Sequence, residues 1–287
     1  IKGMLILVLM LIISMRIDNV SAAYKYVPII NTLSADIKQG KTFKLKIKYT
    51  DAKIKWRSSN KKIATVNKNG VVKGVGIGSC KVYGENKKAK IKWSCLITVG
   101  MNEALAKKNI DTHYVAGKDC IYGYFTNKNK YDVELYAKAA FFDGTHYLIG
   151  TGSDSTYNLQ AGEECVLVFD YPHDEDYNDI IPASFKVTYS VEESTHKGYA
   201  SKIKSAYQIG SAGVSVTFRN NSSKRLEFIR VICIQYDADG NALKYDEDYI
   251  ECTDSGSTDY QVFKFGKDSQ NNDIVPAYAN IYVNYAY

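Results

Sequence analysis

The chain has 287 residues and a net charge of +6; its length exceeds that of one average domain, so we expect two or three domains. The charge is unevenly distributed: residues 35–99 contain 17 basic and 3 acidic side chains, whereas residues 100–287 contain 17 basic and 27 acidic ones. Nucleic acid is not an expected partner, because the sequence has neither zinc-ligand spacing nor an arginine-rich arm.

An apolar run from Gly3 to Met15 lies near the start of the chain, and small residues follow it at 21–23. The run is shorter than the ~20 apolar residues of a membrane-spanning helix. This order of segments is typical of a secretory signal peptide, here over residues 1–23. We therefore expect a secreted or cell-surface protein with no stable membrane span after cleavage; an uncleaved membrane anchor is the alternative.

Residues 32–99 have the pattern of several short β-strands. Apolar residues alternate with lysines over 43–49 and with other residues over 91–99, which predicts half-buried strands. The sequence NKNG between Val66 and Val71 predicts a hairpin turn, in which glycine and asparagine can adopt positive φ. Short strands separated by turn signals predict a β-sandwich.

The stretch WRSSNKKIATVNKNGVVKG within this segment resembles the bacterial immunoglobulin-like domain of group 2. The resemblance covers residues 32–99 and is carried by Trp56, Ser58, Ser59, Asn60, Ile63, Ala64, Thr65, Val66, Gly70, Val72, Gly74, Gly78, Ile97 and Val99. It implies a sandwich in which these residues have structural roles and form no active site. Trp56 is then expected to fill the core, and the polar residues after it to bond their own turn. A ligand-binding role for Trp56 is the alternative.

Six cysteines are distributed as two in each of three segments, which in an exported protein favours disulfides; they are Cys80, Cys95, Cys120, Cys165, Cys233 and Cys252. Inward positions on neighbouring strands predict a bridge between Cys80 and Cys95. The cysteines of the two later segments do not correspond to one another, which weakens the case for bridges there. Free, buried cysteines are the alternative.

An internal repeat organises the rest of the chain. The sequence NDIIPA at 178–183 recurs as NDIVPA at 272–277, and Phe125 and Asn127 correspond to residues 93 positions later. We therefore expect two β-sandwich repeats, each preceded by a linker, so that the segments are 100–111, 112–193, 194–204 and 205–287.

The two repeats also weakly resemble the FxLYD-type extracellular sandwich modules of bacteria. The second copy keeps Tyr236 and Asp237 of the pattern that names that family, and the first keeps Asp143. The resemblance implies a small immunoglobulin-like sandwich. The fold expected for the whole chain is accordingly all-β, with three tandem immunoglobulin-like sandwiches after the signal peptide.

No group of residues in the sequence predicts catalysis, a cofactor or a metal site, so we expect a protein that is not an enzyme. Its histidines lack the i, i+4 spacing of a helical metal site, and it has no G-x-S-x-G motif; the histidines are His113, His146, His173 and His196. The acidic clusters at 173–179 and 237–248 offer oxygen ligands for calcium. A hairpin turn at Asp239 and Gly240 is the better interpretation of the second cluster.

These features predict an exported bacterial protein that acts in adhesion or extracellular interaction. A cell-wall polymer, a glycan or a host surface protein are its expected partners. The basic segment favours anionic wall polymers, although a solvated lysine face explains the same charge. The alternative is a carbohydrate-binding protein that uses exposed tyrosines of the repeats. The chain has 24 tyrosines, and alternation along the last strand predicts that Tyr282 points outward; tyrosine is also common on strands that bind no ligand.

Overall fold

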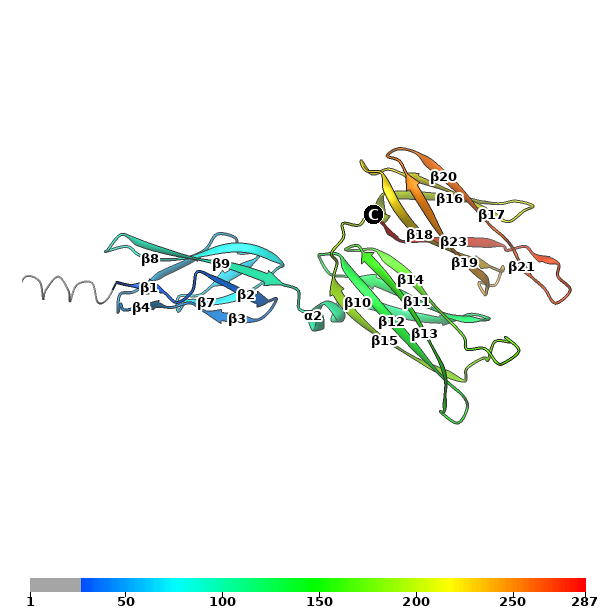
Figure 1. Cartoon of the computed structure of the whole chain (residues 1–287), viewed down its shortest axis with the longest axis horizontal. Helices are drawn as coiled ribbons and strands as arrows, with labels where there is room; N and C mark the ends of the chain where they lie inside the picture. Colours follow the sequence, from blue (N-terminus) through cyan, green and yellow to red (C-terminus); the bar gives the residue numbers. More distant parts are fainter. Residues whose placement is uncertain (1–26) are drawn as a thin grey trace, which may run out of the picture. The chain divides into compact units, whose positions relative to one another are not determined.

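A computed structural model describes residues 27–287, and the predicted signal peptide at 1–23 lies outside this range. The described residues are almost entirely β-strands, which confirms the predicted all-β class. They form two compact units that divide after Asn102. In Figure 1 the first unit is coloured blue to cyan and the second green to red.

The first unit is a sandwich of two sheets with a short extra pair of strands. One sheet has the order β2-β9-β8-β5, with β2 and β9 parallel and the other pairs antiparallel, and the other has the order β3-β7-β6. The strands are β1 (Ile29–Ile30), β2 (Ser34–Lys38), β3 (Thr42–Lys44), β4 (Ile47–Lys48), β5 (Lys55–Ser58), β6 (Ala64–Val66), β7 (Val71–Gly74), β8 (Gly78–Asn86) and β9 (Ile91–Gly100).

Inward residues of both sheets form the core of the first unit, and Trp56 packs against it. Two glycines make room for the indole ring. A Cβ atom at Gly84 would lie 2.9 Å from the ring, and one at Gly70 would lie 3.0 Å from the ring and 2.5 Å from the carbonyl oxygen of Leu45. Gly70 also has a φ of +78°, which side chains rarely adopt, so its position in the hairpin turn requires glycine on two grounds.

The second unit begins with helix α2 (Glu103–Lys108) and continues as two halves with the same strand order. In the first half, sheet β10-β11-β14 faces sheet β13-β12-β15. Its strands are β10 (Ile110–Ala116), β11 (Cys120–Asn127), β12 (Val133–Phe142), β13 (Leu148–Leu159), β14 (Glu164–Asp170) and β15 (Ser184–Glu193). The helix occupies part of the segment that the sequence predicts to be a linker.

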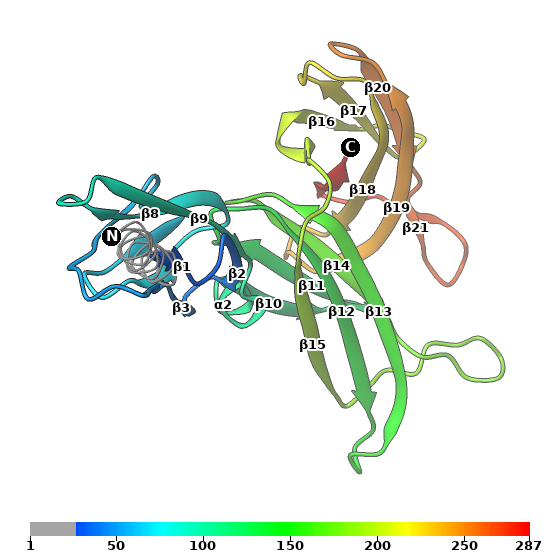
Figure 2. The same cartoon turned by 60° about the vertical axis from the view of Figure 1, so that its left-hand side comes forward.

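In the second half, sheet β16-β17-β20 faces sheet β19-β18-β23. The elements are η1 (Ala200–Lys202), β16 (Ile203–Ile209), β17 (Val214–Asn220), β18 (Leu226–Tyr236), β19 (Ala242–Thr253), β20 (Thr258–Phe263), the short pair β21 (Gly266–Lys267) and β22 (Asp273–Ile274), and β23 (Tyr278–Ala286). Figure 2 shows both halves from a second side, the first in green and the second in yellow to red.

Two buried asparagines that correspond in sequence make the same set of hydrogen bonds in the two halves. The amide of Asn127 donates to the carbonyl oxygens of Tyr131 and Leu159, both at 2.9 Å, and its oxygen accepts the N–H of Asn129. Asn220 donates to the carbonyl oxygens of Lys224 and Thr253 and accepts the N–H of Ser222. In each half the side chain therefore replaces strand pairing at the end of a central strand, where a turn leaves backbone groups buried.

All six cysteines are free, so the predicted bridge between Cys80 and Cys95 is wrong. Both are buried on neighbouring strands, but Cys80 lies opposite Ile97 and Cys95 opposite Val82. A diagonal pair of this kind is separated by about 7–8 Å, whereas bridged Cα atoms lie about 4.4–6.8 Å apart. The alternation in the sequence shows that both side chains point into the core, but it does not show that the two cysteines are offset by two residues along their strands.

Strand register also separates the cysteines of each later pair. Cys120 lies opposite Asp170, whereas Cys165 lies opposite Phe125. Cys233 pairs with Asp246, six residues before Cys252 along the same strand. The alternative of free, mostly buried thiols is therefore the arrangement seen in the structure.

Only Cys252 is expected to react rapidly with a thiol reagent in the native protein, because it is the one exposed cysteine. The thiolate is the reactive form, and burial raises the pKa of Cys95, Cys120 and Cys165, and that of Cys233 to about 12. Counting thiols with a chromogenic disulfide reagent before and after unfolding measures this. The Cys252→Ser variant should lose the fast phase; a lower total after unfolding would reveal a disulfide instead.

Candidate functional site

The two halves of the second unit pack together mainly through sheets β10-β11-β14 and β19-β18-β23, and β13 of the first half's other sheet joins the contact at its edge. Aromatic and aliphatic side chains fill the contact. From the first half come Cys120, Tyr122, Tyr124, Val166 and Val168, and from the second come Ile232, Ile234 and Tyr236, with Ala242, Tyr245 and Tyr282 packed against them. The hydroxyl groups of Tyr124 and Tyr236 are 3.2 Å apart and hydrogen-bonded, and burial raises the pKa of both.

Tyr282 lies in this contact, so the prediction that it is exposed to solvent is wrong. Its side chain points away from the core of its own sandwich, as strand alternation predicts, but the first half covers it. Its ring centroid is 5.8 Å from that of Tyr124, in an edge-to-face arrangement. Tyr282 is therefore a packing residue between the two halves.

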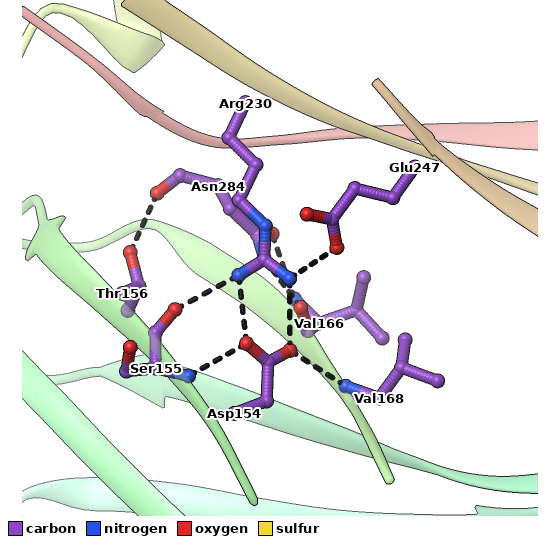
Figure 3. A network of polar contacts seen from close by, with 8 residues as sticks. All are labelled: Asp154, Ser155, Thr156, Val166, Val168, Arg230, Glu247 and Asn284. Carbon is purple, nitrogen blue, oxygen red and sulfur yellow. Dashed lines mark hydrogen bonds and ion pairs between the residues drawn. The ribbon is translucent and has the colours of Figure 1, made fainter. Parts of the chain in front are cut away.

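A network of polar side chains continues the contact beside the aromatic cluster (Figure 3). Arg230 of β18 is 5% exposed, and its guanidinium donates to both carboxylate oxygens of Asp154 of β13, at 2.9 and 3.0 Å. It also donates to the carbonyl oxygen of Ser155 at 2.8 Å and to the carboxylate of Glu247. Burial opposes the charge, but the hydrogen bonds and charges of Glu247 and Asp154 outweigh it and raise the pKa of Arg230.

Asn284 of β23 extends the network to a backbone group of the other half. Its side-chain oxygen accepts the N–H of Val166 at 3.2 Å, and its amide donates to the carbonyl oxygen of the same residue. Its own carbonyl oxygen accepts the hydroxyl of Thr156 at 2.9 Å. The amide therefore occupies the place that a paired strand would take beside β14 (Figure 3).

Sequence reasoning missed this contact, although β18 carried a signal for it. From Ile229 to Tyr236 the strand has apolar residues on both faces, interrupted by Arg230 and Gln235, and all eight residues are buried. A strand of a two-sheet sandwich alternates when one face meets solvent. A run that is apolar on both faces indicates that a second surface covers the sheet, and a charged residue inside such a run requires a buried partner.

The predicted histidines lie in different surroundings. His113 stacks on Tyr124 with ring centroids 4.3 Å apart, His173 pairs with Asp179 at 3.1 Å, and His196 stacks on Tyr287. His146 lies in the loop between β12 and β13 with positive φ. Within residues 27–287 there is no group of three histidine, cysteine, aspartate or glutamate side chains that could hold a metal ion.

The acidic loops considered for calcium use their first aspartate to shape the turn. Asp174 accepts the backbone N–H groups of residues 176 and 178, and Asp237 those of residues 239 and 241. Asp268 does the same for residues 270 and 272. In each loop the asparagine four residues after the aspartate also donates its side-chain amide to it. These three aspartates therefore serve as turn residues.

These loops are expected to loosen in acid. Hydrogen bonds from the asparagine four residues later hold the pKa of Asp174, Asp237 and Asp268 below the usual value. Their contribution to stability is present above the unfolded pKa of about 3.9 and disappears as the pH falls through the lower folded pKa. Amide chemical shifts of Asn241, followed by NMR below about pH 4, should report this. In Asp237→Ala the Asn241 shift should lose that dependence while the loop of Asp268 keeps it.

A cavity of about 650 Å³ opens on the first unit, between the segments 52–56, 66–68 and 85–88. Ile54, Trp56 and Val66 are its apolar lining, and each is partly buried. Its other side chains include five exposed lysines, which are Lys53, Lys55, Lys68, Lys87 and Lys88. The carboxylate among the lining residues, Glu85, accepts a hydrogen bond from Arg57 at 3.1 Å, which lowers the pKa of Glu85.

The polar residues after Trp56 contribute to the framework around this cavity and lie outside it. The hydroxyl of Ser58 accepts the N–H of Asn60, whose side-chain oxygen accepts the N–H of Lys62. Ser59 accepts the N–H of Lys81 on the neighbouring strand, and Gly74 is buried where a Cβ atom would lie 3.0 Å from Val99. Together with Trp56 and Gly70, these residues fix turns and close packing in a seven-stranded sandwich. Residues 30–94 match the family model of the bacterial Ig-like domain (group 2).

The match confirms the resemblance drawn from WRSSNKKIATVNKNGVVKG, with nearly the same boundaries. The group 2 Ig-like domain is a non-catalytic family of bacterial surface and extracellular proteins. No curated protein matches the chain. Within residues 27–287, no helix has the length and apolar character needed to cross a membrane. The group 2 Ig-like domain thus accounts for the first unit, and its lysine-rimmed cavity is the candidate functional site.

Proposed function

We propose that the protein is an exported, non-enzymatic bacterial protein of cell-surface adhesion or extracellular interaction, whose group 2 Ig-like domain binds anionic polymers of the cell wall. The observation that carries the proposal is the separation of charge. Residues 35–99 have a net charge of +14, from 17 basic and 3 acidic side chains, and residues 100–287 have −10, from 17 and 27. The positive charge of residues 35–99 favours their association with an anionic polymer, and the negative charge of residues 100–287 opposes association of the rest of the chain with it.

While the first unit binds the wall, the second unit is suited to meet external partners. Its halves share a buried aromatic cluster and a buried ion pair, which hold two sandwiches as one body. Because this body is acidic, an anionic wall would repel it, which leaves its surface available to external partners.

Salt elution from purified wall material tests the anchor. Surface charges act over about 8 Å at physiological ionic strength and over about 3 Å at 1 M, so the full chain should bind in low salt and elute as the salt concentration rises. Retention that does not change with salt, or no binding in low salt, would contradict the proposal.

A cavity on the first half of the second unit favours the alternative of carbohydrate binding. It has a volume of about 500 Å³ and lies on the outer face of sheet β13-β12-β15. Tyr136 lies there between Ser155 and Ser190 on the neighbouring strands, and its hydroxyl donates to Glu134 at 3.0 Å. A tyrosine held among hydroxyl groups is suited to a neutral sugar ring. Glycan-array binding that disappears in Tyr136→Ala, and persists in the matched variant Tyr260→Ala, would establish this function.

A further inference from the structure

The lysine-rimmed cavity of the group 2 Ig-like domain has an apolar floor with one free polar group. Trp56, Ile54 and Val66 line it. Among the described residues no atom accepts a hydrogen bond from the Trp56 indole N–H, and this nitrogen is not among the buried unpaired atoms, so it is not fully covered. The other tryptophan of the domain differs, because Trp93 donates its N–H to the carbonyl oxygen of Pro28 at 3.0 Å. An indole that lines a cavity and has an unpaired N–H can both stack on a ligand ring and donate to it.

The rim of the cavity carries uncompensated positive charge. None of its five lysines forms an ion pair or a side-chain hydrogen bond with any residue of 27–287. Glu85, the carboxylate among the lining residues, is already paired with Arg57, whose guanidinium also lies 4.1 Å from the ring centroid of Tyr83. The lysines are therefore available to an anionic ligand.

Turn chemistry holds two of the three rim segments in place. The side-chain oxygen of Asn67 accepts the N–H groups of Asn69 and Val71, which fixes the turn that bears Lys68. That of Asn86 accepts the N–H groups of Lys88 and Ala89, which fixes the hairpin that bears Lys87 and Lys88. Because these lysines extend from ordered backbone, less entropy is lost when they bind a ligand than if their loops were mobile.

We propose that this cavity is the binding site for an anionic glycan, with a sugar ring on the Trp56 floor and phosphate or carboxylate groups on the lysine rim. The proposal deepens the wall-anchor function and rests on it, because it assigns one site to the contact that the charge of the domain implies. Charge complementarity selects an anion, and the apolar floor with a free N–H selects a ring over a simple polyanion.

The test uses the full chain with Trp93→Phe, so that Trp56 is its remaining tryptophan and its fluorescence reports the cavity. Three probes of matched length are titrated: an oligogalacturonate as the anionic glycan, a neutral maltooligosaccharide, and polyphosphate as an anion without rings. We expect the oligogalacturonate to bind most tightly and to change Trp56 emission. Polyphosphate should bind more weakly without that change, and the neutral sugar should bind weakest.

Two charge-matched variants locate the site. The rim variant replaces Lys53, Lys55, Lys68, Lys87 and Lys88 by glutamine, and the control variant replaces five exposed lysines outside the cavity, Lys46, Lys48, Lys61, Lys73 and Lys81. Both lose the same charge. We expect the Kd for oligogalacturonate to rise by more than about tenfold in the rim variant, since each lysine near an anionic surface contributes separately. The control should change it by less than about threefold.

Equal losses in the two variants, or equal binding of polyphosphate and oligogalacturonate, would overturn the assignment of the site. Salt-sensitive retention on wall material would then still support the anchor, which would act through its whole basic surface. If the chain neither binds oligogalacturonate nor is retained on wall material in low salt, the site and the proposed function both fail.

Discussion

Replacing Arg230 by methionine is expected to lower the free energy of unfolding of the second unit by about 3–5 kcal/mol. Arg230 is 5% exposed and bonds both oxygens of Asp154, the carbonyl oxygen of Ser155 and the carboxylate of Glu247. Methionine fills similar space but leaves without a cation the carboxylates of Asp154, which is largely buried, and of Glu247, which is partly buried. Their mutual repulsion and lost hydrogen bonds add to the cost.

Urea unfolding followed by circular dichroism measures this change, and Arg225→Met is the matched control. Arg225 belongs to the same half and approaches Asp254 at 3.7 Å, but both side chains are largely exposed. Exposed pairs of this kind contribute little to stability, so the control should unfold almost as the wild type does. If the two variants had equal midpoints, the ion pair of Arg230 would not be a stabilising contact between the halves.

Arg230→Lys separates charge from geometry. Lysine keeps the positive charge but cannot place two parallel N–H groups on Asp154 while also reaching Ser155 and Glu247. We expect this variant to be less stable than the wild type and more stable than Arg230→Met. Stability equal to that of the methionine variant would mean that the two-point geometry, rather than the charge, is decisive.

The sequence was sufficient for the fold of the first unit because each signal in it is local. Alternation over 91–99, the turn at Asn69 and Gly70, and Trp56 with its polar neighbours all act within a few residues of their positions. The single strand predicted over 43–49 is wrong, because β3 and β4 divide it between two sheets and Tyr49 is exposed with a positive φ. The alternation of apolar residues correctly predicted that Cys80 and Cys95 lie in the core. The predicted disulfide between them was wrong because it also requires the two residues to lie opposite each other. That register is set by all residue pairs of the two strands together and is not visible at any single position.

The contact between the halves of the second unit could not be predicted from local sequence signals, because it joins residues that are far apart in the chain. Strand alternation determines which face of β23 bears Tyr282, but it does not show whether solvent or another sheet covers that face. Asp154 and Arg230 are 76 residues apart in sequence, so no local pattern connects them. The lysine-rimmed cavity is similar, since three loops from different parts of the chain form it. The fold brings these residues together, so only the structure shows that they form one site.

Asn284→Ala is expected to weaken the cohesion of the two halves by leaving a buried peptide group unpaired. The Asn284 side chain is the partner of both the N–H and the carbonyl oxygen of Val166, and Asn284 is 1% exposed. Each buried group left without a partner costs about 1–3 kcal/mol, so the second unit should unfold at clearly lower denaturant concentration. Asn284→Asp should be at least as damaging, because its carboxylate would face the carbonyl oxygen of Val166 with no proton to share.

Asn272→Ala provides the comparison, since that asparagine lies in an exposed loop and its side chain donates to Asp268 within its own turn. Differential scanning calorimetry distinguishes the two kinds of effect. If the amide of Asn284 joins the halves, its loss should lower the transition temperature of the second unit and separate the unfolding of its two sandwiches, whereas Asn272→Ala should leave one cooperative transition for the second unit. A single transition at the wild-type temperature in Asn284→Ala would mean that the aromatic cluster alone holds the halves together. In that case Tyr124, Tyr236 and their neighbours would be sufficient to keep the two sandwiches together, and the polar network would not be needed for it.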